Sequence, residues 1–239
     1  MMHGEVSAGR LARLDWPAIA RQLDERGHAV TPPLLTAAEC RAVAAMWNDT
    51  GRFRSHIDMA RHRFGEGEYR YFAEPLPAVV ARLRTWAYAR LAPTANRWTA
   101  ALGRDERFPE TLPAFTTYCA ARGQHRPTPL LLRYAAGGYN CLHQDIYGEN
   151  VFPIQVAFLL SEPGKDFTGG EFVLIEQRPR MQSRAEVVSL QQGEGVAFAV
   201  SHRPARGTRG PYRVNLRHGV SRLRSGHRNT MGIIFHDSK

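Results

Sequence analysis

Apolar residues in about the first hundred positions recur at intervals of three to four, the spacing of amphipathic helices. One such run covers positions 10–27, and Thr36 and Glu39 form a capping-box pair that opens a second run. A third run, at positions 77–102, is rich in alanine, leucine and arginine, and we expect a helix interrupted near Pro93. The pattern predicts that the N-terminal part of the chain is helical.

After about Pro109 the pattern changes to short β-rich runs, which glycine, proline or polar clusters separate. The expected strands are 130–135, 152–160, 171–176, 186–190, 195–200, 212–217 and 229–235. Many short strands in close succession are typical of a β sandwich or barrel. We therefore predict an α+β protein in two parts, a helical region at 1–108 packed on a β domain at 109–239.

The composition is that of a globular protein. Apolar residues make up 43% of the 239 residues, and no apolar run approaches the roughly 20 residues that span a bilayer. The first ten positions hold no apolar stretch of the kind found in secretory signals. Three widely spaced cysteines exclude a disulfide framework and offer no CxxC zinc pair. We expect a reduced, cytoplasmic protein without a membrane partner.

The net charge of +10 changes the picture, because it favours a polyanionic partner such as nucleic acid. Positions 195–236 carry eight arginines and no acidic residue. The stretch 203–213 contains glycine and proline, so we expect a loop in which Arg206 and Arg209 are candidate phosphate contacts. The alternative is a solvated basic face without a partner.

Two His-x-Asp triplets occur in the chain, and their surroundings differ. His56 and Asp58 lie in a segment rich in arginine and histidine without a strand pattern, where a solvated surface pair is expected. His143 and Asp145 lie between two β runs, and residues two apart on a strand project to the same face. His218, at the end of a distant expected strand, is the candidate third ligand. Two histidines and a carboxylate leave half of an octahedron open, an arrangement that suits catalytic non-haem Fe(II).

Three further features accompany this triad. Tyr134 lies nine residues before its first histidine, a Gly-Gly-Glu run ends at Glu171, and Arg228 lies ten residues beyond its last histidine. Together with the triad, they resemble the Fe(II)/2-oxoglutarate dioxygenase superfamily over about residues 127–237. The resemblance implies a double-stranded β-helix and an oxygenase that uses Fe(II), 2-oxoglutarate and O₂.

The resemblance also assigns roles to residues around the metal. It implies that Tyr134 and Arg228 contact 2-oxoglutarate, and the planar fork of an arginine suits the far carboxylate of that molecule. Thr230 lies two positions further along the same expected strand and shares its face, so we expect it to add a hydroxyl donor. In such enzymes 2-oxoglutarate is decarboxylated to succinate while a C–H bond of the substrate is hydroxylated.

Five segments resemble a bacterial group of these oxygenases to which oxidative demethylation of damaged bases is attributed. They are 67–72, 123–130, 139–148, 176–183 and 232–237. That reaction requires a base that is flipped out of a duplex or single-stranded, and stacked on aromatic side chains. The candidates for stacking are Tyr69, Tyr71, Phe72 and Tyr147.

Two other functions stay open. Leu132 stands where the similar AlkB-type demethylases carry asparagine, and those enzymes place their 2-oxoglutarate arginines further from the distal histidine. The Gly-Gly-Glu run and the ten-residue spacing before Arg228 are more similar to prolyl-hydroxylase-type enzymes, so a protein or small-molecule hydroxylase is the first alternative. The second is a non-catalytic sensor of Fe(II) and 2-oxoglutarate, against which an intact triad argues.

Overall fold

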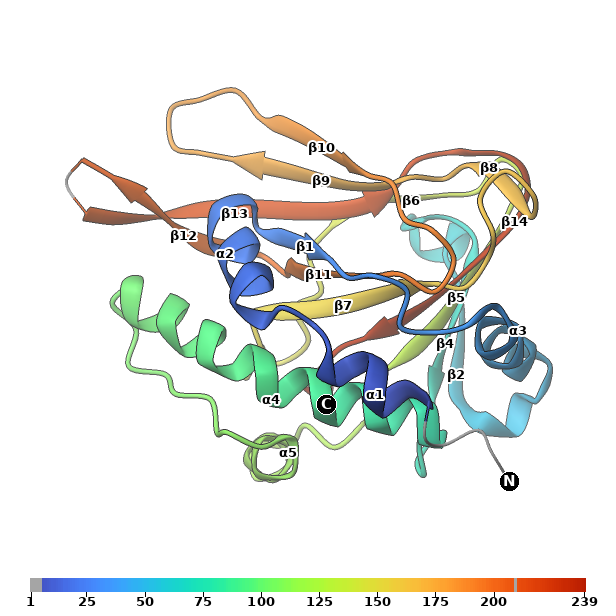
Figure 1. Cartoon of the computed structure of the whole chain (residues 1–239), viewed down its shortest axis with the longest axis horizontal. Coiled ribbons are helices and arrows are strands. Elements are labelled where there is room, and N and C mark those ends of the chain that lie inside the picture. Colours follow the sequence, from blue (N-terminus) through green and yellow to red (C-terminus); the bar gives the residue numbers. More distant parts are fainter. Residues whose placement is uncertain (1–5, 209) are drawn as a thin grey trace.

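The computed structural model describes residues 6–208 and 210–239, in which two antiparallel sheets face each other (Figure 1). The α-helices are α1 (Val6–Ala12), α2 (Trp16–Arg26), α3 (Ala37–Ala45), α4 (Ala78–Ala101) and α5 (Leu112–Ala120). Short 3₁₀ turns lie at Met46–Asn48, Thr50–Arg52 and Ala60–His62.

The larger sheet has the strand order β1-β11-β7-β14-β5-β4-β2, with β8 paired to β14. Its strands are β1 (His28–Val30), β2 (Phe53–Asp58), β4 (Glu68–Phe72), β5 (Leu130–Ala135), β7 (Ile154–Leu159), β8 (Phe167–Gly169), β11 (Gly195–Ala199) and β14 (Leu223–Ile233). The smaller sheet has the order β10-β9-β13-β6-β3, with β12 paired to β13. Its strands are β3 (Gly65–Glu66), β6 (Tyr139–His143), β9 (Phe172–Gln177), β10 (Arg184–Val188), β12 (His202–Gly207) and β13 (Gly210–Val220).

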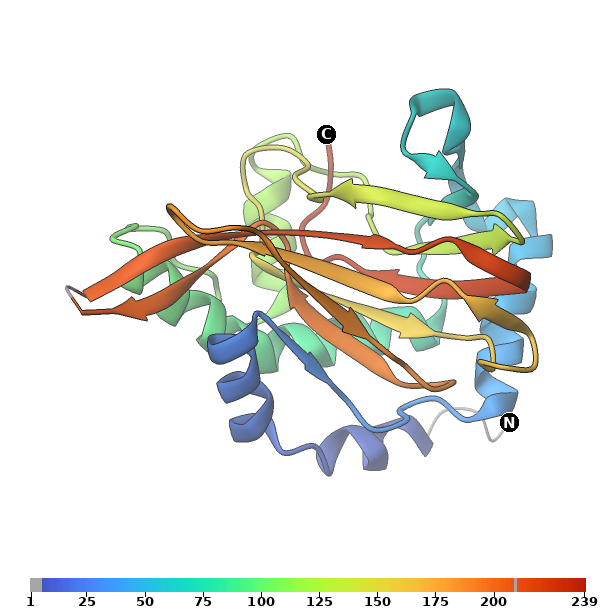
Figure 2. The ribbon, with the colours of Figure 1, turned by 90° about the horizontal axis from the view of Figure 1, so that it is seen from above.

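Side chains alternate between the two faces of the larger sheet, as the pleat of a strand requires. On β14, Met231 and Ile233 belong to a core shared with α4, whereas Arg228 and Thr230 face the space between the sheets. Phe198 and Phe172, from opposite sheets, lie in a second core between them, with ring centroids 4.8 Å apart. The arrangement is a double-stranded β-helix whose larger sheet is covered by helices (Figures 1 and 2).

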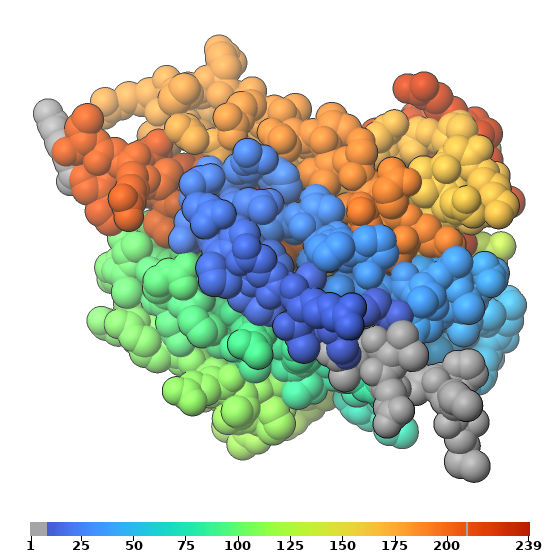
Figure 3. Space-filling model, viewed as in Figure 1, coloured from blue at the N-terminus to red at the C-terminus, as the bar shows by residue number. Residues whose placement is uncertain are grey.

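The N-terminal region contributes strands as well as helices. β1 to β4 lie within positions 28–72 and join both sheets. In the space-filling view, the N-terminal segment (blue) lies across one face between the green α4–α5 region and the orange strands (Figure 3). The expected helical region therefore holds strands as well as helices, and the boundary at 108/109 stays a prediction. These strands were missed because β1 and β3 are very short and β2, an edge strand, has no alternating burial.

All seven expected strands are present, six of them with shifted ends and one, 130–135, with the expected ends, but two local expectations are wrong. α4 continues through Pro93, whose side chain is exposed, so water can bind the carbonyl that loses its helical partner. The expected loop at 203–213 is a β-hairpin of β12 and β13, in which Arg206 pairs with Pro211. Pro204 is tolerated there because β12 pairs with β13 alone and needs no donor on its outer side.

Candidate metal centre

Neighbouring strands of the smaller sheet bring the predicted metal ligands together. His143 ends β6 and is the register partner of His218 on β13. Asp145 lies in the loop just beyond β6, so the expectation that it shares a strand face with His143 is wrong. The loop nevertheless turns the carboxylate inward, and the candidate ligand atoms of the three residues lie within 4.8 Å of one another.

A hydrogen bond orients the imidazole of His143 for metal binding, whereas the buried Nδ1 of His218 has no hydrogen-bond partner among the described residues. His143 Nδ1 donates to the Cys141 carbonyl at 2.8 Å, which leaves Nε2 free to face Asp145 Oδ1 at 3.3 Å. His218 Nε2 lies 3.2 Å from Asp145 Oδ2. A histidine whose second nitrogen donates to a carbonyl is the usual arrangement in protein metal sites. The donor set fits Fe(II), and it is the only such group of His, Cys, Asp or Glu side chains in the described ranges.

The charges at this centre also suit a cation. Burial by itself would raise the pKa of Asp145, but hydrogen bonds from His143 and His218 hold that pKa well below its ordinary value. Burial opposes the charge on His143 too, yet the adjacent carboxylate raises its pKa. The pKa of His218 is lowered, mainly by burial. The directions for Asp145 and His218 favour the anionic and neutral forms that metal ligation requires, whereas on His143 a cation would replace the proton that Asp145 stabilises.

Two further side chains hold the Asp145 carboxylate. The Tyr147 hydroxyl donates to Oδ1 at 2.8 Å, and Gln155 Nε2 donates to Oδ2 at 2.8 Å. Tyr147 was expected as a stacking residue, and its hydroxyl has this additional role. Gln155 was not foreseen, because a single glutamine in an apolar strand gives no sequence signal. Each oxygen of the carboxylate thus has a protein donor that fixes its orientation.

A cavity of about 480 Å³ opens beside the triad, between the two sheets. Tyr69 and Tyr71 of β4 line it together with Tyr147, and their role in stacking stays a prediction. Phe72 does not, because the next residue on a strand faces the other side. It is fully buried in the helix-covered core, stacked on Phe53 at 4.9 Å, so its assignment as a stacking residue is wrong.

Arg228 forms the charged end of this cavity. It is 3% exposed, and its Nη1 donates to Thr230 Oγ1 at 2.6 Å. Its guanidinium carbon lies 5.9 Å from the ring centre of Tyr134, its register partner on β5. Burial lowers the pKa of Arg228 and raises the pKa of Tyr134 to about 12. In the described part of the chain, no carboxylate lies within salt-bridge distance of Arg228. A buried cation without a counterion fits the far carboxylate of 2-oxoglutarate.

The remaining predicted residues lie elsewhere. Arg206, on β12, lines a surface groove beside α2 and α4 and not the metal cavity, and Arg209 lies outside the described residues. His56 is exposed, with Nε2 2.9 Å from Glu68 Oε2, as expected of a surface pair. Its segment is nevertheless a strand, β2, contrary to expectation. The Oδ2 atom of Asp58, at the end of β2, lies 3.3 Å from Nε of Arg61.

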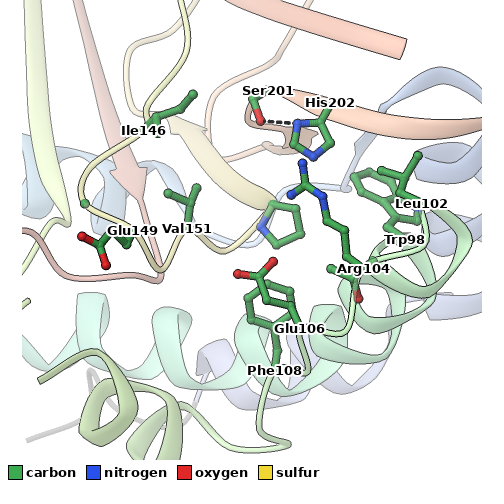
Figure 4. A pocket seen from close by; sticks show the side chains of 13 residues that line it. Trp98, Leu102, Arg104, Glu106, Phe108, Ile146, Glu149, Val151, Ser201 and His202 are labelled. Carbon is green, nitrogen blue, oxygen red and sulfur yellow. Dashed lines mark hydrogen bonds between the residues drawn. The ribbon is translucent and has the colours of Figure 1, made fainter. Parts of the chain in front are cut away.

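A smaller cavity of about 210 Å³ lies behind the loop that carries Asp145 (Figure 4). Ile146 and Glu149 of this loop line it, whereas Asp145 and Tyr147 line the metal cavity. Figure 4 shows the Ser201 hydroxyl beside Nδ1 of His202, at 2.9 Å. None of the metal ligands reaches this cavity, so it is separate from the metal centre.

Comparisons with known proteins agree with this centre. A family model of oxygenases, described as catalysing oxidative methylation of damaged DNA, matches residues 67–238. The match spans the triad and Arg228. The chain belongs to this oxygenase family.

Relatives and solved structures extend the comparison. The chain is 48% identical over 167 residues to "Uncharacterized protein Rv2227" of Mycobacterium tuberculosis H37Rv, a match that covers 70% of this chain and 72% of the relative. A prolyl-4-hydroxylase from Pseudomonas putida has a TM-score of 0.55 at 14% identity, over 94% of this chain and 99% of that one. A 2OG-Fe(II) oxygenase family oxidoreductase from Burkholderia pseudomallei has a TM-score of 0.54 at 17% identity, over 94% and 92%. These two structures share the fold.

The family, the fold and the triad together identify an Fe(II)/2-oxoglutarate-dependent oxygenase, which uses O₂ as its second co-substrate. His143, Asp145 and His218 are the residues that would hold the iron, and Arg228 with Thr230 would hold the far carboxylate of 2-oxoglutarate. The bound metal supplies the activation of O₂. None of the described helices is both long and apolar enough to cross a membrane.

Proposed function

We propose that this oxygenase acts on N-alkylated bases in nucleic acid and removes the alkyl group as an aldehyde. The observation that carries the proposal is the family match, since the described reaction concerns damaged DNA and the matched residues include the whole metal centre. One atom of O₂ enters a C–H bond of the N-methyl group and the other enters succinate, with loss of CO₂ from 2-oxoglutarate. The N-hydroxymethyl product then breaks its C–N bond, releases formaldehyde and returns a proton to the base nitrogen.

The walls of the metal cavity support a planar aromatic substrate. Tyr69 and Tyr71 meet edge to face at 5.4 Å, and Tyr71 meets Tyr147 in the same way at 6.4 Å. Bases that react inside an enzyme are held out of the stack by aromatic side chains in such pockets. A cavity of about 480 Å³ lies within the range of small-molecule sites.

The charge distribution supports a polyanionic substrate. The net charge is +10, and Arg213 and Arg217 are both exposed on the outer face of β13, opposite to the face from which His218 lines the metal cavity. Arg206 is exposed near the tip of the adjoining hairpin. Exposed arginines supply the sequence-independent part of nucleic-acid binding through contacts with phosphates.

Succinate formation tests the proposal directly. Protein loaded with Fe(II) without oxygen is mixed with 2-oxoglutarate and exposed to O₂, with methylated or unmodified single-stranded DNA, and Asp145→Ala serves as the inactive control. Stimulation by methylated DNA alone, with formaldehyde released, is the expected result. Slow turnover that disappears in Asp145→Ala but is indifferent to DNA would refute the substrate and favour a protein or small-molecule hydroxylase. Binding of 2-oxoglutarate without turnover on any substrate would favour a sensor.

A further inference from the structure

Two large apolar side chains are exposed at the mouth of the metal cavity. Phe64 is 47% exposed and Leu142 is 45% exposed, and both line the cavity that holds the triad. Burying such side chains in water-free surroundings is favourable, so their exposure beside the catalytic metal suggests that a partner covers them.

The backbone beside Phe64 adopts an unusual conformation. Arg63 has φ of 59°, in the left-handed region that side chains with a Cβ rarely adopt. The Phe64 N–H donates to the Met59 carbonyl at 3.0 Å, and the Phe64 carbonyl accepts from the Cys141 N–H at 2.8 Å. These bonds fix the backbone of Phe64, whose half-exposed ring stacks on His62 with the ring centroids 5.3 Å apart. Arg63 is the C-cap of the 3₁₀ turn Ala60–His62, and its left-handed conformation sets the direction in which the chain continues to Phe64.

A second irregularity places Leu142. In the pairing of β6 with β13, His143 opposes His218 and Asn140 opposes Val220, so β6 carries one extra residue between these pairs. Such a β-bulge changes the direction of side chains and is frequent next to active sites. Here it lets Asn140 and His143 both face the cavity, where Asn140 Nδ2 donates to the Tyr134 hydroxyl at 3.4 Å. Leu142, next to His143, is left exposed.

We propose that Phe64 and Leu142 form a wedge that enters the base stack of a nucleic-acid duplex and holds the target base in the cavity. The inference rests on the proposed function, because a base inside a duplex reaches the metal only after it leaves the stack. Phenylalanine and leucine are side chains that proteins insert between base steps for this purpose. Arg63, also at the mouth, has no acidic partner in the described part of the chain, and its charge suits the flanking phosphate.

Comparing duplex with single-stranded substrate tests the wedge. Two oligonucleotide substrates carry one N-methylated adenine, one single-stranded and one duplex, and formaldehyde release is measured with Phe64→Ala/Leu142→Ala. We expect kcat/KM on the duplex to fall by about tenfold or more, because the base must now unstack without help, while the rate on the single strand changes by less than about twofold. Met181→Ala/Val187→Ala is the matched control, since Met181 and Val187 are 60% and 58% exposed and do not line the cavity. The control should match wild type on both substrates.

A fluorescence measurement adds a readout that needs no turnover. 2-Aminopurine beside the methylated base brightens when its neighbour leaves the stack, so wild-type protein without iron should raise its emission and the wedge variant should not. If Phe64→Ala/Leu142→Ala lost the same share of kcat/KM on single strand and duplex, or kept its activity on the duplex, the wedge would be overturned while the proposed function survived. Wild-type protein that turns over neither oligonucleotide would overturn both. If the variant lost activity only on a peptide substrate, Phe64 and Leu142 would be assigned to polypeptide binding, and the wedge would again be overturned.

Discussion

Replacing Arg228 by methionine separates its role in binding 2-oxoglutarate from any role in folding. The arginine is 3% exposed, no carboxylate among the described residues lies within salt-bridge distance of it, and Glu171 acts on its charge only from further away. Methionine is unbranched and uncharged and ends two atoms short of the guanidinium nitrogens, so the substitution keeps the apolar stem and removes the cation. A role in binding predicts weaker binding of 2-oxoglutarate with unchanged stability of the ligand-free protein. A role in folding predicts a lower melting temperature of the ligand-free protein.

The magnitude follows from the contacts that the guanidinium can make. A bidentate pair supplies two hydrogen bonds to a charged group, each worth about 1.5–3 kcal/mol, or about 3–6 kcal/mol together. At about 1.4 kcal/mol per tenfold, the Kd for 2-oxoglutarate should rise by about two to four powers of ten. Without 2-oxoglutarate, loss of the Thr230 hydrogen bond, which also involves the charged guanidinium, costs about 1.5–3 kcal/mol, whereas removal of a buried charge without an ion-pair partner gains on the order of several kcal/mol. The ligand-free variant should therefore melt at the wild-type temperature or above.

The assay is anaerobic titration calorimetry of the Fe(II)-loaded protein with 2-oxoglutarate, paired with thermal unfolding with and without the ligand. Arg224→Met is the control, because Arg224 lies on the same strand but is exposed. Unchanged affinity in Arg228→Met would remove Arg228 from the binding site. A markedly lower melting temperature of ligand-free Arg228→Met would show that groups in the folded protein already stabilise the charge of Arg228. That result would refute the reasoning from the absence of a carboxylate within salt-bridge distance.

Three other changes are expected to have distinct effects. Asp145→Ala should abolish succinate formation while Asp58→Ala leaves it at the wild-type level, and the reverse result would relocate the metal centre. Tyr147→Phe should weaken Fe(II) binding by about 10–100-fold in an anaerobic competition titration, because Asp145 loses a donor, and an unchanged Kd would contradict that role. Contacts with Arg178 and Arg203 lower the pKa of Glu176 against the opposing effect of burial, so this group stabilises the protein above its unfolded pKa of about 4.5. That stability is lost as the pH falls through the lower folded pKa, so Glu176→Gln should flatten the decline of the melting temperature on the acid side. If the melting temperatures of variant and wild type fell in the same way at acid pH, the linkage would be refuted.

Much of the metal centre was predictable because its chemistry depends on residue types at fixed spacings. A His-x-Asp triplet between two β runs, a distant histidine and an arginine ten residues later indicated the triad and Arg228. Gln155 could not be predicted in this way, because its role depends on the point at which β7 passes the Asp145 carboxylate. The hydroxyl contact of Tyr147 likewise depends on the path of a loop.

The sequence by itself determined the β-rich character of the C-terminal half, its main strands and the residue types at the metal. These features are local, since alternation within a strand and ligand spacing are properties of short segments. The tertiary structure decided which face each aromatic side chain presents, so that Tyr71 lines the cavity while the adjacent Phe72 is buried behind it. It also decided that the segment 28–72 adds strands to both sheets, and that a bulge in β6 exposes Leu142. Register, bulges and edge pairing arise from contacts between distant segments, and no single segment encodes them.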